Sequence, residues 1–145
     1  MLSKVEKLQR SVVDFISRRE ALRNIAVVAD RSSSLDEKFD EKLAPKIGLS
    51  VIVKRPELTD ASIAGSVITF GTVICTVRVV ENLLTNACGM SAATVAEIIL
   101  KSLTGFTAEG ASAAWAPRPL YPWYQQVGTT TTNVVEITVI TSMDI

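Results

Sequence analysis

Apolar side chains recur at helical spacing in the N-terminal segment. Leu8, Val12, Phe15 and Ile16 are three or four positions apart, which places them on one face of a helix. The pattern predicts a helix over residues 3–18.

Two shorter elements are predicted next. The run "IAVVA", residues 25–29, is too short for a helix and rich in branched side chains, so it indicates a buried strand. In "LDEKFDEKLAPK" an apolar residue occurs at every fourth position. This spacing predicts an amphipathic helix that begins after the N-cap residue Ser34 and stops near Pro45.

Three further segments have the pattern of strands. "GLSVIVKR" alternates apolar positions over residues 48–54, and Pro56 with "ELTDAS" predicts a loop behind it. "SVITFGTVICTVRVVEN", residues 66–82, is rich in Val, Ile and Thr and longer than a common strand. We expect it to project beyond the sheet, with Gly71 at a bulge or bend. The run "TNVVEITVITSMDI" predicts a last strand over residues 133–141.

Helical spacing returns in "MSAATVAEIILKSLTGF". Ser91 is the expected N-cap and Gly105 the expected C-terminal stop. The order of elements predicts an α+β fold in which helices pack on one face of a mixed, mainly antiparallel sheet with one long protruding strand or hairpin. A chain of 145 residues is most economically one domain, residues 1–145.

The charge balance argues against nucleic acid as a direct ligand. Fifteen basic and fifteen acidic residues leave no net charge, so counterion release from a phosphate polymer has little to act on. The longest apolar runs are shorter than a membrane span, and the N-terminus lacks the pattern of a secretory signal. We therefore expect a protein of the cytosol with no membrane partner.

The sequence offers little to catalysis. It contains no histidine, the commonest general base and a usual zinc ligand, and no glycine-rich phosphate-binding loop. Carboxylates gather in "LDEKFDEK", but the interleaved lysines favour a solvated helix face over a metal site. Cys75 and Cys88 lack C-x-x-C spacing, and we interpret both as inert thiols. We expect no enzymatic activity, no cofactor and no metal.

Aromatic residues and prolines are concentrated in "WAPRPLYPWY", which begins at Trp115. Large, stiff side chains and arginine dominate binding energy at interfaces, so this segment is a candidate docking element. The alternative is that its rings fold over the sheet edge and seal the core. Similarly, "GTTTTN" suits either an exposed edge strand or a turn. The residues of the interface hypothesis are Trp115, Arg118, Tyr121, Trp123, Tyr124 and, in the long strand, Arg78.

The order of these features resembles bacteriophage tail terminator or tail completion proteins of the minor tail protein U-like family. The resemblance covers nearly the whole chain, by order and spacing. It includes the amphipathic first helix, "IAVVAD", "LSVIVKRP", the long strand "TVICTVRVVEN" ending at Glu81-Asn82, the helix "TVAEIILKSLTGF" and the strand "VVEITVIT". The aromatic segment is not matched to a motif of the family.

The resemblance implies a subunit that closes into a homo-oligomeric ring, typically a hexamer, at the head-proximal end of the tail tube. Such a ring stops tube polymerisation and offers a surface to head-tail connector or neck proteins, and in some tails to the sheath. The location implied is the virion tail or neck, with assembly in the host cytoplasm. A closed ring needs two different patches on each subunit, which the aromatic segment and the long strand could supply.

Three other functions stay open. A head-tail joining or neck subunit makes similar demands on the sequence. A tail tube subunit is less favoured, because the sequence shows no second long hairpin-forming pair. A small-ligand-binding α+β domain would need a pocket with converging polar groups.

Overall fold

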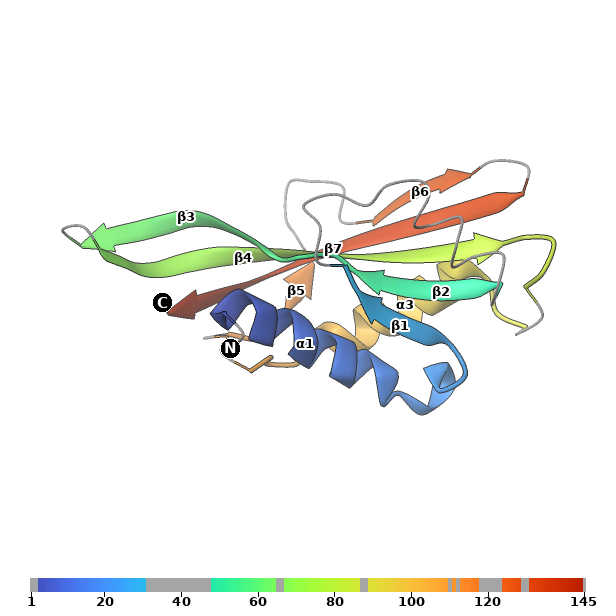
Figure 1. Ribbon diagram of the computed structural model, residues 1–145, viewed down its shortest axis with the longest axis horizontal. Helices are drawn as coiled ribbons and strands as arrows, with labels where there is room; N and C mark the ends of the chain where they lie inside the picture. Colours follow the sequence, from blue (N-terminus) through green and yellow to red (C-terminus); the bar gives the residue numbers. More distant parts are fainter. Residues whose placement is uncertain are drawn as a thin grey trace.

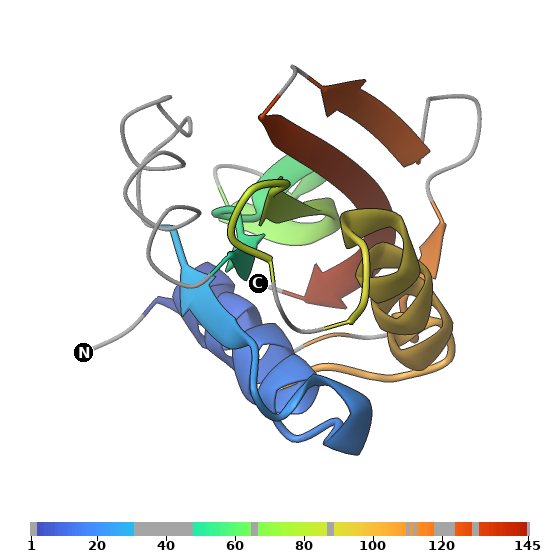
Figure 2. The same cartoon turned by 90° about the vertical axis from the view of Figure 1, so that its right-hand side faces the viewer.

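In the computed structural model of the chain, two helices lie on the same side of a seven-stranded curved sheet (Figures 1 and 2). The structure describes residues 3–30, 48–64, 67–86, 89–109, 111, 113–117, 124–128 and 131–144. Within these ranges the chain forms two α-helices and seven strands.

The centre of the sheet is a long antiparallel pair of strands, β4 (Val67–Asn82) and β7 (Thr132–Asp144). At ~3.4 Å per residue, 16 residues extend about 54 Å, whereas a compact domain of this length is roughly 40 Å across. One end of β4 must therefore leave the body of the molecule, as Figure 1 shows.

The other strands flank this pair along both of its edges. On the β4 side, β2 (Leu49–Val53) pairs with the second half of β4 and β3 (Glu57–Ala64) with the first half. Next to β2 lies β1 (Ala26–Ala29), the parallel neighbour.

The β7 side carries two short strands. Ala116–Pro117 forms β5, and Tyr124–Gly128 forms β6. Among the described strands, every pair other than β1 with β2 is antiparallel. The predicted α+β class with a mixed, mainly antiparallel sheet and a protruding hairpin is confirmed.

The two helices begin at capped N-termini. Helix α1 (Lys4–Ser17) has a capping box formed by Ser3 and Glu6, which satisfies free N–H groups of the first turn. Helix α3 (Ala92–Leu103) has the predicted cap, with the Ser91 hydroxyl accepting a hydrogen bond from the Thr94 N–H. A short 3₁₀ turn, Glu20–Leu22, follows α1. Neither described helix is long and apolar enough to cross a membrane.

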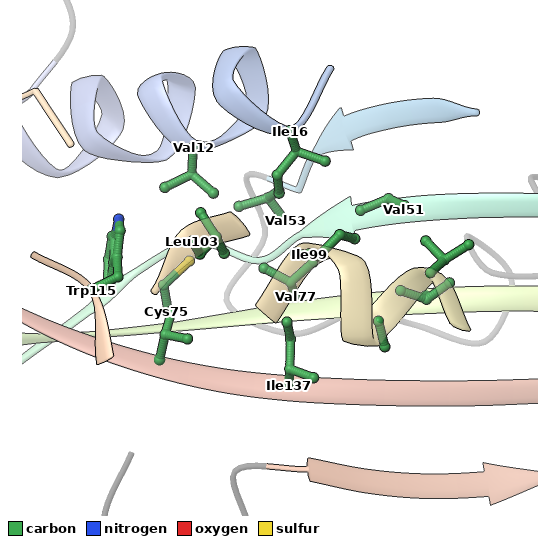
Figure 3. Close-up of a cluster of buried hydrophobic side chains, with 14 of the residues drawn as sticks. Val12, Ile16, Val51, Val53, Cys75, Val77, Ile99, Leu103, Trp115 and Ile137 are labelled. Carbon is green, nitrogen blue, oxygen red and sulfur yellow. The ribbon is translucent and has the colours of Figure 1, made fainter. Parts of the chain in front are cut away.

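The core lies between the helices and one face of the sheet (Figure 3). Alternate residues of the central strands point into it, among them Cys75, Val77 and Ile137. Gln9 of α1 is a buried polar exception, since its Nε2 donates to the backbone oxygens of Asp30 (2.7 Å) and Val53 (3.0 Å). These bonds attach the helix to the ends of β1 and β2, because a buried amide left unpaired would be costly.

The predicted loop over "ELTDAS" is wrong, because these residues belong to β3. The strand lies at a sheet edge and is held by backbone pairing with β4, which polar side chains do not prevent.

A register shift between Thr59 and Ser62 places an extra β3 residue opposite Gly71. The irregularity expected at Gly71 is therefore present, with the extra residue on the partner strand, and a second shift between Ser62 and Ile63 leaves Thr69 of β4 as an extra residue. Strands β3 and β4 together form the protruding hairpin. The predicted helix after Ser34 lies outside the described residues.

Candidate assembly surfaces

Trp115, the first residue of the predicted docking segment, lies in the core. Its side chain is 1% exposed and packs in the cluster that includes Cys75 and Leu103 (Figure 3). Gly105, at a φ of +89°, turns the chain after α3. The Gly105 N–H then donates to the Trp115 oxygen (3.1 Å), and the Trp115 N–H donates to the Phe106 oxygen (2.9 Å). These bonds hold the indole beneath the helices, so the interface role predicted for Trp115 is corrected to a core role.

The other aromatic residues of that segment are not placed by the structure. Arg118, Tyr121 and Trp123 lie outside the described residues, and Tyr124 is described only through its backbone pairing with Ile137 in β6. Their interface role stays a prediction.

Arg78 lies on the sheet face opposite the helices. Its Nε donates to Glu136 Oε1 at 2.7 Å, and a second guanidinium nitrogen contacts the same oxygen. The hydroxyls of Thr76 and Thr138 form the next pair, 3.4 Å apart. Arg78 thus has a partner within its own chain, and its role in an interface stays a prediction.

The first half of the β4 hairpin forms an arm that projects from the body (Figure 1). We define the arm as β3 together with residues 67–72 of β4. The outer edge of β3 has no partner strand among the described residues, and β7 accompanies β4 only as far as Phe70. Unpaired strand edges carry free backbone donors and acceptors, which makes them templates for pairing with another chain.

Two leucines at the other end of β4 are exposed. Leu83 is 48% exposed and Leu84 is 78% exposed. Among the residues whose side chains are described, which leave out 60–70 and 121–127, no other large apolar side chain is so exposed. They belong to a turn, residues 83–86, which we call the leucine turn. In Figure 1 it follows the right-hand end of β4, opposite the arm.

Hydrogen bonds attach the backbone of the leucine turn to its surroundings. Leu83 N–H donates to the Thr131 oxygen (2.9 Å), Leu84 N–H to Asn82 Oδ1 (3.0 Å) and Asn86 N–H to the Asn82 oxygen (2.9 Å). Gly48 lies against the turn, and a Cβ at Gly48 would be 2.8 Å from backbone atoms of the turn. The turn is therefore tightly packed even though its leucines face solvent.

A buried carboxylate joins the turn to α3. Glu81, 7% exposed, accepts hydrogen bonds from Asn86 Nδ2 (2.7 Å) and from the Ala92 N–H (3.1 Å). A negative charge is favourable at a helix N-terminus. Asn86 Nδ2 also donates to the Met90 oxygen (2.8 Å), so the turn and the start of α3 are held as one unit.

Sequence reasoning missed the leucine turn. Its signal was "ENLLTN", in which two adjacent leucines follow the end of a strand and precede polar residues. Neighbouring residues of an extended strand face opposite sides, so one of two adjacent leucines would face away from the core even if the strand continued. That break in alternation could have marked the pair as exposed.

The described residues offer no cluster of side chains for a metal ion. No group of three or more His, Cys, Asp or Glu side chains among them could hold a metal ion. Cys75 is fully buried, and burial raises the pKa of its thiol to about 12. Cys88 lies outside the described residues.

The chain has an α+β fold with a projecting hairpin arm at one end and an exposed apolar turn at the other. No protein-family model and no curated protein matches the sequence. Among solved structures, the fold is similar to that of a chain in the virion of a native gene transfer agent particle, with a TM-score of 0.65 at 12% identity over 99% of both chains. A second solved chain is similar with a TM-score of 0.54 at 14% identity, over 96% of this chain and 91% of the other. At 12% and 14% identity, these similarities extend to the fold alone.

Proposed function

We propose that the protein is a structural subunit of a phage-like virion. The observation that carries the proposal is the end-to-end similarity to a chain from the virion of a gene transfer agent particle, which leaves almost no residue of either chain unmatched. A virion subunit works by contact with other proteins. The exposed leucine turn and the open arm are surfaces suited to contact of that kind.

Within the virion, we propose the role of a tail terminator. The subunit forms a ring, hexameric in our proposal, that caps the head-proximal end of the tail tube and stops its polymerisation. The order of sequence elements supports this role, and so does the shape, since a closed ring requires two different surfaces per subunit. One face of the ring contacts the tail tube protein, and the other contacts the connector or neck protein and, in a contractile tail, the sheath.

The proposed role requires no chemistry. The sequence has no histidine, and the described residues contain no metal-binding cluster. We propose that the protein is not an enzyme and acts by shape, in the virion after assembly in the host cytoplasm.

Electron microscopy tests the proposal in two steps. The purified protein is first imaged by negative stain, where closed rings of uniform size are expected. It is then mixed with tail tubes assembled from the tube protein of the same particle. The tail terminator role predicts a single ring at one end of each tube and an arrest of elongation.

Other results separate the alternatives. Rings that bind the portal side of filled heads and ignore tubes would support a neck subunit instead. Incorporation of the protein along the whole tube would support a tube subunit. A chain that stays monomeric with both tubes and heads would overturn the virion proposal.

A further inference from the structure

The leucine turn and the arm lie at opposite ends of the longest axis of the molecule (Figure 1). In a head-to-tail ring, a patch on one subunit meets a different patch on the next. We propose that the leucine turn of one copy docks on the arm of its neighbour. This contact rests on the proposed ring and names the surfaces that close it.

The leucine turn has the properties of a preformed binding element. Leu83 and Leu84 present apolar surface to solvent, while the backbone between them and Asn86 is fixed by hydrogen bonds to Asn82 and Thr131. Ordering a flexible loop on binding costs conformational entropy. Here much of that order exists before binding, so burial of the leucines contributes more fully to affinity.

The arm fits an apolar partner better than a charged one. The sequence from residue 61 to residue 71, "ASIAGSVITFG", has no charged residue, in a chain that is 21% charged overall. Natural edge strands are commonly protected by charges, prolines or covering segments, and charges and prolines are absent from this stretch. Glu57 and Asp60 lie in the half of the arm nearer the body, and the uncharged outer half, with its open β3 edge, is expected to be covered in the assembled state. Its occupant, we infer, is a second copy of the chain.

Two variants test the contact from its two sides. The turn variant carries Leu83→Ser and Leu84→Ser. The arm variant replaces residues 61–70 with Asn-Gly, a two-residue hairpin turn, and keeps the pairing of Thr59 with Thr72. The matched control is Glu97→Ser with Lys101→Ser, two exposed positions on α3 whose replacement leaves the net charge unchanged.

Assembly is followed by native mass spectrometry and light scattering across concentration. Wild type and control are expected to form the same rings. The turn variant should need at least about tenfold more protein to assemble, since ~1.4 kcal/mol per contact changes affinity tenfold. Melting of each isolated subunit is measured in parallel, and the turn variant should melt within about 2 °C of the control because exposed substitutions cost little.

Mixing the two variants gives the decisive result. Each turn-variant subunit keeps an intact arm, and each arm-variant subunit keeps an intact turn. A 1:1 mixture can therefore form one proper contact and no more. Dimers at twice the 15.6 kDa subunit mass are expected, with no ring.

The outcomes separate this inference from the function it rests on. If wild type and turn variant form identical rings, the contact is overturned and the ring stands. If the turn variant forms rings that no longer cap tubes, the turn binds the tube protein and the contact is again overturned. If wild type never assembles, both the ring and the contact are overturned.

Discussion

The Cys75 thiol is fully buried, and burial raises its pKa from 9.0 to about 12. Below pH 9 the thiol is protonated in both the folded and the unfolded chain, so it adds no pH dependence to stability. Between pH 9 and 12 the unfolded chain loses this proton while the folded protein keeps it. Stability must therefore fall as pH rises through this window.

We predict that the free energy of unfolding of the wild type, measured relative to Cys75→Ala, falls by about 1.4 kcal/mol per pH unit above pH 9. The measurement is urea unfolding of both proteins at a series of pH values from 8 to 11. Cys88 is present in both, so its titration cancels in the difference. A difference that stays constant across the series would contradict burial of the Cys75 thiol.

Trp115 and Leu84 show that residue type alone does not predict which side chains are buried and which are free to contact a partner. Tryptophan favours both cores and interfaces, and three prolines nearby made an exposed loop plausible. The backbone bonds of Trp115 to Gly105 and Phe106 decide its burial, and these depend on where the chain returns after α3. Leucine usually lies inside, yet the turn after Asn82 leaves Leu84 78% exposed. Tertiary contacts, which a single sequence does not reveal, bury the tryptophan that was expected at a surface and expose the leucine that would be expected in the core.

At the scale of elements, helix α3 tests the packing of the core. Ile99 is fully buried against the sheet, whereas its neighbour Ile98 is partly buried at the rim of the core. We predict that Ile99→Asp lowers the free energy of unfolding by about 3–5 kcal/mol, because it removes apolar burial and places a carboxylate in the core.

Ile98→Asp should cost less, because its carboxylate can reach water, and Glu97→Gln, at an exposed position, should change stability by no more than about 0.5 kcal/mol. Urea unfolding of the three variants measures how much each one lowers the free energy of unfolding and so ranks them. Equal losses of stability for Ile98→Asp and Ile99→Asp would contradict this orientation of α3, in which Ile99 faces the core and Ile98 lies at its rim.

Periodicity predicted most elements but not β3. The helix at residues 4–17 and the strand at 132–144 bury one face each, so their apolar residues repeat with the period of the element. The strand at 49–53 is buried on both faces and is marked by its short run of branched apolar residues. Strand β3 lies at an edge, contains Asp60 and has a register shift. Its pairing with β4 is made by backbone groups, which leave no period in the sequence.

At the scale of the whole molecule, the absence of a metal-binding cluster among the described residues makes a simple prediction. Because a structural metal would contribute its binding energy to folding, treatment with EDTA should change neither the melting temperature nor the mass of the assembly. Calorimetry and light scattering before and after dialysis against EDTA provide the measurement. Loss of assembly that zinc or calcium restores would contradict the prediction.

The pairing of β4 with β7 also governs how the chain must fold. Arg78 and Glu136, which face each other across the pair, are 58 residues apart in sequence, and Thr76 and Thr138 are 62 apart. Closing such long loops costs chain entropy before the contacts that offset this cost have formed. Chains dominated by pairings between distant residues therefore fold slowly. While β7 is undocked, the edge of β4 is open to pairing with other chains. Refolding of this subunit is therefore expected to be slow and, as concentration rises, increasingly in competition with aggregation.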